Sequence, residues 1–280
     1  MKKILVSLCT LFACGGTSSN SATTPPAPTT YTFGAGQPVQ SGTEQANAAS
    51  NAGSSTQGVV SASSSGASTN NAAALTDVPN LPTDIAAELG EALIAMPNPV
   101  AAAIAGSASN ARRALQSGCY TVSNNTITYN NCSLSDSGFT FGIDGSLTAT
   151  PSNVTWNINA TYGLVSGTES VNFKGAETGN LNFTTTANGG TISGLATTGF
   201  AGNESANNQT INFAYTAQVT FKSLTWSNSC DGFFTGGAMD VTVTVAVNGT
   251  QPNETGFENL GLEFTWQGCD NVLVATGTPH

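Results

Sequence analysis

The sequence predicts a mainly β fold, an antiparallel meander or sandwich preceded by one or two short helices. From Cys119 onward, apolar residues alternate with Thr, Asn, Gln and Ser at a period of two, which gives each strand one dry and one wet face. Four cysteines lie in the same region, as expected for a disulfide-bonded domain. A helical period precedes the strands, at about residues 83–115.

The helical segment is predicted to form two short helices separated by a Pro-Asn-Pro motif at residues 97–99. Thr83 or Asp84 can cap the first helix, and Gly118 can end the second. Both apolar stripes are narrow and rich in alanine, so we expect the helices to pack closely on a sheet or on each other. The stripes are Ile85, Leu89 and Leu93 in the first helix and Val100, Ile104, Ala111 and Leu115 in the second.

The strands expected between residues 119 and 276 are antiparallel, because parallel strands buried on both faces would be apolar throughout. Their apolar phase slips between Phe221 and Leu224, which predicts a bulge or a turn at Lys222-Ser223. Turns are expected at Gly189-Gly190, Asn203-Glu204, Asn248-Gly249 and Asp270-Asn271. The apolar positions that define the strands are Phe139 to Ala149, Val154 to Leu164, Val171 and Phe173, Leu181 and Phe183, Ile211 to Phe221, Met239 to Val247, and Leu260 to Trp266.

The N-terminus combines two lysines, a short apolar run from Ile4 to Ala13 and a cysteine. The run is too short to span a bilayer and is typical of a signal peptide, here residues 1–13. It resembles the signal peptide of bacterial lipoproteins, whose lipobox is matched by Leu11-Phe12-Ala13-Cys14, with Phe12 bulkier than the usual residue. The resemblance implies cleavage before Cys14 and attachment of fatty acids such as palmitate to its sulfur and its new amino group, which anchors the chain in a membrane.

The residue that follows the lipidated cysteine bears on the location of such lipoproteins. Gly15, rather than aspartate, follows Cys14, and under the enterobacterial sorting rule this implies the outer membrane. We therefore expect a lipid-anchored protein in the outer membrane of a Gram-negative bacterium, on either its cell-surface or its periplasmic side.

Residues 14–75 are expected to form a lipidated N-terminus and a disordered tether to the domain at residues 76–280. The stretch is rich in Ser, Thr, Asn, Ala, Gly and Pro and almost lacks large apolar residues, so it cannot bury enough surface to offset its ordering entropy. Tyr31-Thr32-Phe33 is an isolated aromatic segment within the tether, and we assign it no role.

Two disulfides are expected in the mature chain. Cys9 leaves with the signal peptide and Cys14 carries lipid, so an even number of cysteines remains in an oxidising compartment. The remaining cysteines are Cys119, Cys132, Cys230 and Cys269. Their spacing alone allows three connectivities.

A predicted hairpin about Asn124-Asn125 favours one of these connectivities. In that hairpin Tyr120 lies opposite Tyr129, so a bond between Cys119 and Cys132 requires a bulge at Asn130-Asn131. This choice leaves Cys230 to pair with Cys269.

Composition and charge exclude several classes of function. The only histidine is His280, so no imidazole within the fold can act as a general base or a metal ligand. Six Lys and Arg against 16 Asp and Glu leave no basic surface for nucleic acid. The glycines form no phosphate-binding motif and the cysteines lack zinc-ligand spacing, so we expect no cofactor and no metal.

The remaining chemistry rests on carboxylates and on exposed aromatic rings. Trp226 lies beyond the phase slip and near Cys230, so it is a candidate for stacking on a ligand, together with the loop acids Asp231 and Asp270. A glycosidase needs two carboxylates flanking the bond that it cleaves. The carboxylates that could form such a pair are Asp144, Asp231, Asp240, Glu258 and Glu263.

The sequence therefore predicts a lipoprotein with a non-catalytic binding or envelope-structural β domain rather than an enzyme. The expected partners are the membrane, through the N-terminal lipid, and a glycan or an envelope protein. One alternative is a carbohydrate-active enzyme that uses paired carboxylates. A second alternative is a lipid or lipoprotein carrier, although the wet strand positions disfavour the apolar concave face that a carrier needs.

Overall fold

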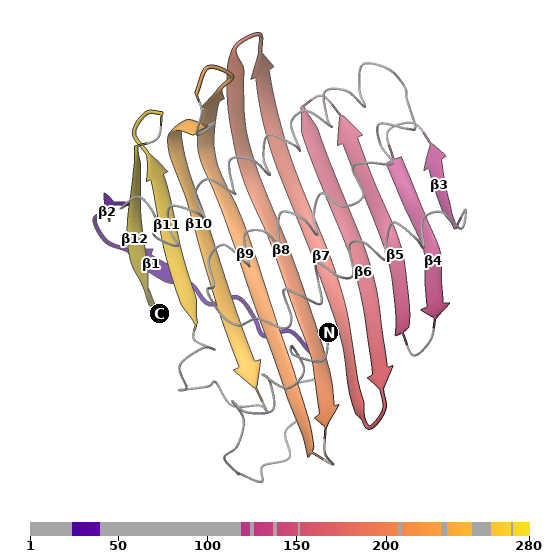
Figure 1. The fold of residues 1–280 in the computed structure, drawn as a ribbon. Coiled ribbons are helices and arrows are strands. Elements are labelled where there is room, and N and C mark those ends of the chain that lie inside the picture. Colours follow the sequence, from indigo (N-terminus) through magenta and orange to yellow (C-terminus); the bar gives the residue numbers. More distant parts are fainter. Residues whose placement is uncertain are drawn as a thin grey trace.

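The computed structural model describes residues 24–39, 119–123, 126–136, 139–150, 152–206, 209–230, 234–247, 259–269 and 271–280. Within these ranges all regular secondary structure is β-strand, and the strands form one antiparallel sheet of 12 strands (Figure 1). The predicted mainly β, antiparallel meander is thereby confirmed. The helices expected at about residues 83–115 lie outside the described residues, as do residues 1–23 and 40–118.

The strands follow one another in the sheet almost in the order of the sequence. The path across the sheet is β1-β12-β11-β10-β9-β8-β7-β6-β5-β4-β3, and β2 also pairs with β12. The strands are β1 (Tyr31–Phe33), β2 (Gln37–Pro38), β3 (Tyr120–Ser123), β4 (Thr126–Asp136), β5 (Phe139–Thr150), β6 (Asn153–Ser166), β7 (Glu169–Thr186), β8 (Gly189–Ala206), β9 (Gln209–Ser227), β10 (Phe234–Val247), β11 (Leu260–Trp266) and β12 (Val272–Pro279).

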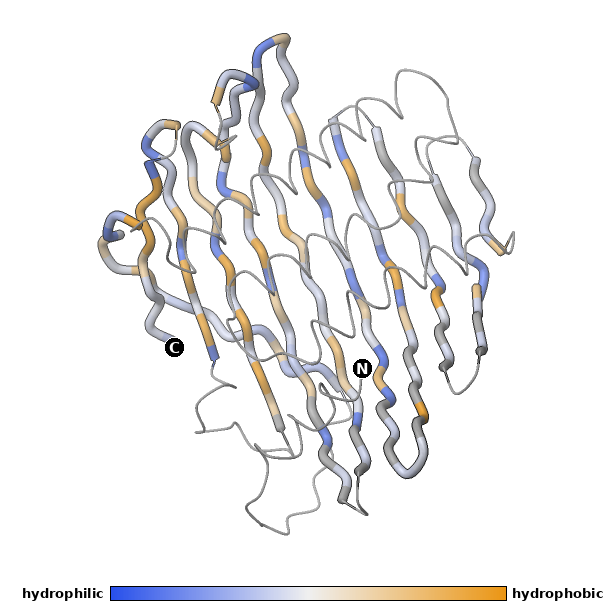
Figure 2. The backbone as a smooth tube through the Cα atoms, in the orientation of Figure 1, coloured by the Kyte–Doolittle hydropathy of each residue, from blue (hydrophilic) through white to orange (hydrophobic). Residues whose placement is uncertain are grey.

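Side chains of opposite character point to the two faces of the sheet. Residues paired across strands share a face, and successive residues of one strand alternate between faces. Apolar and polar residues alternate along the strands accordingly (Figure 2). We call the two sides the apolar face and the polar face. One row of the apolar face runs Trp156, Gly179, Ala196, Val219, Val241 and Leu262 across six consecutive strands.

The apolar face carries the hydrophobic core of the described residues. Burial of each large apolar side chain stabilises the fold by roughly 1.5–3 kcal/mol, so a continuous buried face over the sheet is its main source of stability. The largest side chains with less than 2 % exposure are Tyr129, Phe234, Phe264, Leu147, Leu181, Ile192, Leu224, Met239 and Val154.

Two β-bulges keep the apolar side chains in phase. Asn131 (φ 48°) is an extra residue in β4, between the pairs that Tyr129 and Cys132 make with β5. Ser223 (φ 50°) is the extra residue in β9. Phe221 and Leu224 are three residues apart and would lie on opposite faces of a regular strand, but the bulge places both on the apolar face. Both bulges lie where the sequence predicted them.

Both predicted disulfides are present. Cys119 and Cys132 are bonded with Cα atoms 5.2 Å apart, and the β4 bulge brings Cys132 within reach. Cys230 and Cys269 are bonded with Cα atoms 5.5 Å apart. The first bond fixes the edge strand β3, and the second joins the end of β9 to the connection between β11 and β12.

Two predicted turns need correction. Asn203-Glu204 lies inside β8, because Asn203 pairs with Asn212 and Glu204 with Ile211 in an uninterrupted ladder. Gly189-Gly190 begins β8, and the turn itself is at residues 187–188. The Asn248-Gly249 turn lies outside the described residues.

The tether prediction is wrong for residues 24–39. Tyr31–Phe33 pairs with Gly277–Pro279 as β1, and Gln37–Pro38 pairs with β12 as β2. The composition of the stretch is typical of a disordered segment, but small residues of the sheet provide the surface on which it packs.

A glycine on the apolar face makes room for the Trp156 ring. Any Cβ at Gly179 would overlap the indole of Trp156, whereas a Cβ at Gly34 would meet no atom within 4 Å. We expect Gly179→Ala to lower the free energy of unfolding by about 1–3 kcal/mol through overpacking. The matched control Gly34→Ala should change it by less than about 0.5 kcal/mol. Equal denaturation midpoints for the two variants would contradict this packing.

Candidate functional site

The polar face is divided into two parts by the N-terminal segment. Residues 25–33, which we call the strap, run across β8 to β12 (Figure 1) and make the part of the face beneath them a covered half. The polar face of β5, β6 and β7 is the open half. Most of its side chains are exposed.

The first part of the strap crosses the central strands of the sheet. Pro25 lies over β8, where a Cβ at Gly199 would come within 2.9 Å of the proline ring. Over β9, the hydroxyl of Thr216 donates a hydrogen bond to the carbonyl of Pro26. Over β10, the Thr29 N–H donates to Thr244 Oγ1 at 2.8 Å. Thr216 and Thr244 pair with each other, so the strap follows one row of the sheet.

The second part of the strap ends as an edge strand. Tyr31 lies over β11, where a Cβ at Gly261 would be 2.5 Å from its ring. The His280 N–H donates to the Thr30 carbonyl at 3.1 Å, next to the β1–β12 ladder. Small residues on the polar face make this close approach feasible. Those buried there are Gly199, Ala201, Ala214, Thr216, Thr244, Gly261 and Ala275.

The open half is a polar surface rich in asparagine and threonine. Asn157, Asn159 and Thr178 are exposed, and their side chains make no hydrogen bond within the part of the chain that the structure describes. Their amide and hydroxyl groups can both donate and accept hydrogen bonds. The exposed polar residues of this half are Thr140, Asp144, Asn157, Asn159, Thr161, Asn172, Lys174, Thr178, Asn180, Asn182, Thr184 and Thr186.

One side of the open half is ordered by a hydrogen-bonded amide cluster. Asn153 Nδ2 donates to Asn180 Oδ1 at 2.7 Å and to Asn182 Oδ1 at 3.0 Å. The cluster holds the side chains of two asparagines of β7 in fixed positions. A surface that is ordered before binding loses less side-chain entropy when a ligand binds.

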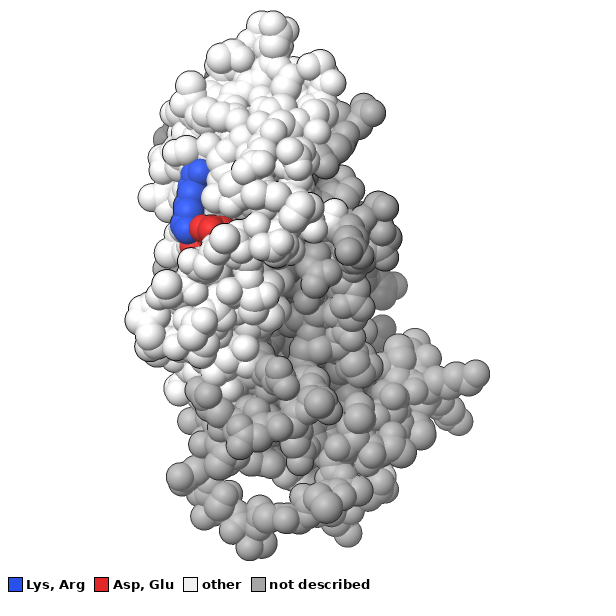
Figure 3. Space-filling view, turned by 90° about the vertical axis from the view of Figure 1, so that its left-hand side faces the viewer, with Lys and Arg blue, Asp and Glu red and all other residues white. Residues whose placement is uncertain are grey.

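The covered half contains a compact group of charges. Lys222 Nζ lies 2.6 Å from Asp240 Oδ2 and 2.8 Å from Glu263 Oε2, and 5.6 Å from the centre of the Phe33 ring. Figure 3 shows a basic side chain against acidic ones on a side of the described surface that is otherwise uncharged. Asp240 and Glu263 are cross-strand partners, so the described residues bring these two candidate carboxylates together.

The ionisation of this group reflects its partial burial. Burial raises the pKa of Asp240, the Lys222 charge opposes the rise, and Glu263 adds to it. Burial lowers the pKa of Lys222, but the hydrogen bonds and charges of Asp240 and Glu263 outweigh this, so the pKa of Lys222 is raised overall. Because a single ammonium bridges both carboxylates, the group serves to hold β9, β10 and β11 together.

Of the other predicted site residues, the structure describes Asp144 and Trp226, and both lie apart from this pair. Asp144 is on β5 in the open half, where it accepts a hydrogen bond from the Asn131 N–H at 3.2 Å. Trp226 is 4 % exposed on the apolar face, so its ring is part of the core rather than a surface platform. Asp231, Glu258, Asp270 and Cys14 lie outside the described residues.

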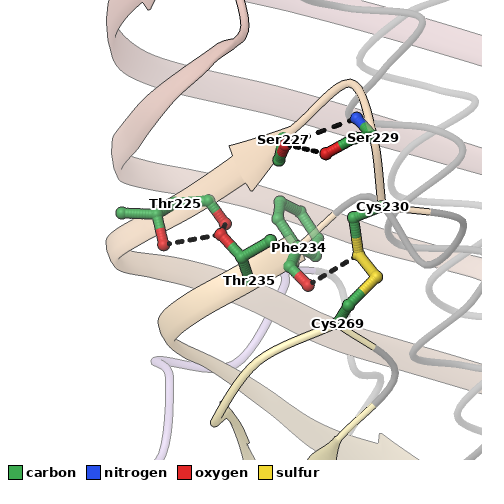
Figure 4. The surroundings of a disulfide bond; sticks show 7 residues. All are labelled: Thr225, Ser227, Ser229, Cys230, Phe234, Thr235 and Cys269. Carbon is green, nitrogen blue, oxygen red and sulfur yellow. Dashed lines mark hydrogen bonds between the residues drawn. A yellow bond between two sulfur atoms is a disulfide. The ribbon is translucent and has the colours of Figure 1, made fainter.

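The Cys230–Cys269 disulfide lies at the boundary between the core and the surface, because Cys230 is buried and Cys269 is exposed. Serine and threonine side chains and Phe234 surround it (Figure 4). Cys230 Sγ lies 3.5 Å from the Phe234 carbonyl oxygen. A disulfide sulfur carries no hydrogen, so this is a packing contact rather than a hydrogen bond. The Phe234 ring stacks edge-on against Trp266 at 4.9 Å. These contacts pack the disulfide against the aromatic side chains of the core.

Glu177 is the residue that our sequence analysis missed. It lies on the apolar face and is 5 % exposed, in a row with Ile158 and Thr198. Burial and the nearby Glu177 charge together raise the pKa of Tyr215. The signal was available, because Glu177 is in phase with Phe173 and Leu181 along the strand.

Neither a metal site nor a membrane-spanning helix is found in the described ranges. They contain no group of three or more His, Cys, Asp or Glu able to hold a metal ion. They also contain no helix long and apolar enough to cross a membrane. Comparisons with protein-family models, curated proteins and solved structures find no match to this chain.

Removal of the Lys222 ammonium is predicted to lower the free energy of unfolding by an amount that depends on pH. Lys222→Met leaves Asp240 and Glu263 side by side without a counter-ion, so we expect a loss of about 1–2 kcal/mol at pH 7. This is less than for a fully buried pair because the Lys222 side chain is 44 % exposed. The loss should shrink below about pH 5, since protonation removes the repulsion and the raised pKa of Asp240 already favours its neutral form at low pH.

Lys174→Met is the matched control for this variant, because Lys174 is exposed on the same face and has no ion pair in the described structure. It should change stability by less than about 0.5 kcal/mol at either pH. Urea unfolding at pH 7 and pH 4.5 measures both variants. A Lys222→Met defect that stays constant with pH would contradict the assignment.

The contact between the Tyr31 ring and Gly261 predicts how the strap can be displaced. Gly261→Val places a branched side chain where the Tyr31 ring lies, so we expect β1 to detach while the sheet remains folded. Limited proteolysis within residues 24–39 should then accelerate at least about tenfold, since local opening no longer costs the free energy of the strap contacts. Gly34→Ala is the control. An unchanged cleavage rate for Gly261→Val would show that the strap does not depend on this contact.

Proposed function

We propose that the protein is a lipid-anchored, non-catalytic module of the bacterial outer membrane whose open half binds an uncharged, hydroxyl-rich ligand such as a glycan. The observation that carries the proposal is the open half itself, an exposed sheet surface of asparagine and threonine. Its asparagines Asn157 and Asn159 use none of their side-chain hydrogen-bonding capacity within the described part of the chain.

The chemistry of this surface supports a neutral ligand. Amide side chains both donate and accept, as a hydroxyl-rich ligand requires. The charged residues that project from the polar face of β5, β6 and β7 are Asp144 and Lys174, which are opposite in sign. The whole chain, by contrast, has a formal charge of −10. The open half is therefore close to neutral on a strongly acidic protein.

Lipid anchoring at Cys14 is supported by the lipobox and by the two disulfides. The lipobox Leu11-Phe12-Ala13-Cys14 provides the acceptor sulfur. Disulfides form and persist in the oxidising environment outside the cytoplasm, where such lipoproteins are delivered.

The structure offers less support for the two alternative functions. A carbohydrate-active enzyme requires a pair of carboxylates with different ionisation and access to substrate. Asp240 and Glu263 are instead clamped by Lys222 beside the strap. A carrier requires an open apolar face. The described core residues of the apolar face are at most 9 % exposed.

Loss of exposed amides and hydroxyls should weaken glycan binding. The soluble Cys14→Ser chain is titrated with a panel of neutral polysaccharides, with dextran as one member, and with heparin as the anionic comparison. The combined substitution Asn157→Ala, Asn159→Ala and Thr178→Ala should weaken binding at least about tenfold, because each lost hydrogen bond costs roughly 0.5–1.5 kcal/mol.

The control variant carries Thr276→Ala and Thr278→Ala, which remove exposed hydroxyls from the other side of β12. It should bind like the parent chain. Failure of every neutral polysaccharide to bind, or equal weakening by both variants, would contradict the proposal. Hydrolysis of a bound polysaccharide would replace it with the enzymatic alternative.

A further inference from the structure

We infer that the open half lies against the headgroup layer of the membrane that holds the lipid anchor. The inference rests on anchoring at Cys14, which is part of the proposed function. It names the membrane surface as the source of the ligand that the open half binds. It follows from where the strap begins on the sheet and from the length of chain that separates this point from Cys14.

The strap begins at the centre of the polar face. Pro25 lies over Gly199, which is the eleventh of the 18 residues of β8. β8 has five strands on either side along the path of the sheet. With strands about 4.8 Å apart and a rise of about 3.3 Å per residue, the nearest rim of the sheet is roughly 23 Å away in any direction.

The chain between the anchor and this point is short. Pro25 is eleven residues beyond Cys14, so the two cannot be further apart than about 36–40 Å even when the chain is fully extended. Random-coil scaling gives a root-mean-square separation of only about 18 Å. The upper limit follows from covalent geometry and holds whatever conformation residues 14–24 adopt.

The two orientations of the sheet make different demands on this chain. With the polar face away from the membrane, the chain must run about 23 Å to the rim and then past a layer about 10 Å thick. That path consumes nearly all of its extended length. With the polar face toward the membrane, the lipid lies directly below Pro25, and a separation near the random-coil value suffices. Of these two orientations, the one with the polar face toward the membrane is favoured, because it extends the chain least.

The composition of the open half agrees with a location at a headgroup layer. Ala176 is the partner of Gly199 on β7, next to the start of the strap, and it is exposed, as is Asn159 beside it on β6. The charges in this half are one Asp and one Lys, so an anionic membrane does not repel it as it would the remainder of an acidic protein.

The test measures which face lies near the lipid in the full-length, lipidated protein. Ala176→Cys and Thr276→Cys are labelled separately with one fluorophore; Ala176 is on the open half and Thr276 is exposed on the opposite side of the sheet. Each protein is incorporated from outside into phosphatidylcholine vesicles that contain a lipid with a headgroup nitroxide. The label at position 176 should be quenched at least about twofold more strongly than the label at position 276.

A longer chain between Cys14 and Pro25 tests whether the short length of this chain sets the orientation of the sheet. A 20-residue Gly-Ser insertion after Ser21 allows the chain to reach around the rim, so the difference in quenching between the two labels should fall. Equal quenching of the two labels in the parent chain, or an insertion without effect, would overturn the inference.

Vesicle flotation of the parent chain and of Cys14→Ser, with mass analysis of the N-terminal peptide, reports on the anchor separately. A lipidated chain with equal quenching refutes the orientation alone and leaves the proposed glycan binding standing. A parent chain without lipid would contradict the anchor and the orientation with it.

Discussion

An unbroken antiparallel ladder from β3 to β12 assigns every residue of the sheet to one of two faces. Because cross-strand partners share a face, a slip of one residue in any strand would exchange its apolar and polar side chains. The bulges at Asn131 and Ser223 restore the phase where the sequence departs from strict alternation. The buried core, the strap and the open polar surface all follow from this one assignment.

The polar face shows how a sheet surface can be given two uses by side-chain size. Where residues are small, as at Gly199 and Gly261, the strap approaches the backbone and covers the face. Where they are longer amides, as at Asn157 and Asn159, the face stays exposed. The strap also covers the unpaired side of β12, which protects an edge that could otherwise pair with another chain. The same segment therefore protects the edge strand β12 and separates the covered half of the polar face from the open half.

Much of the sheet could be predicted because period-two alternation is local information. The disulfide pairing followed from it as well, once the hairpin register opposed Tyr120 to Tyr129 and the bulge at Asn131 was included. The strap could not be predicted, since its composition resembles a disordered segment and its binding surface comes from residues more than 150 positions away. The Lys222 group was equally hidden, because it needs the register of three strands.

Amide hydrogen exchange of the intact, oxidised chain tests most directly whether the strap is a fixed part of the fold. The account predicts that the amides of Thr29 and His280, which donate to Thr244 and Thr30, exchange at least about 100-fold more slowly than unstructured chain. Exchange of Thr29 at the rate of a free peptide, with β8 to β11 still protected, would contradict the account. The strap would then not be bound to the sheet, and neither the division of the polar face nor the orientation at the membrane would hold.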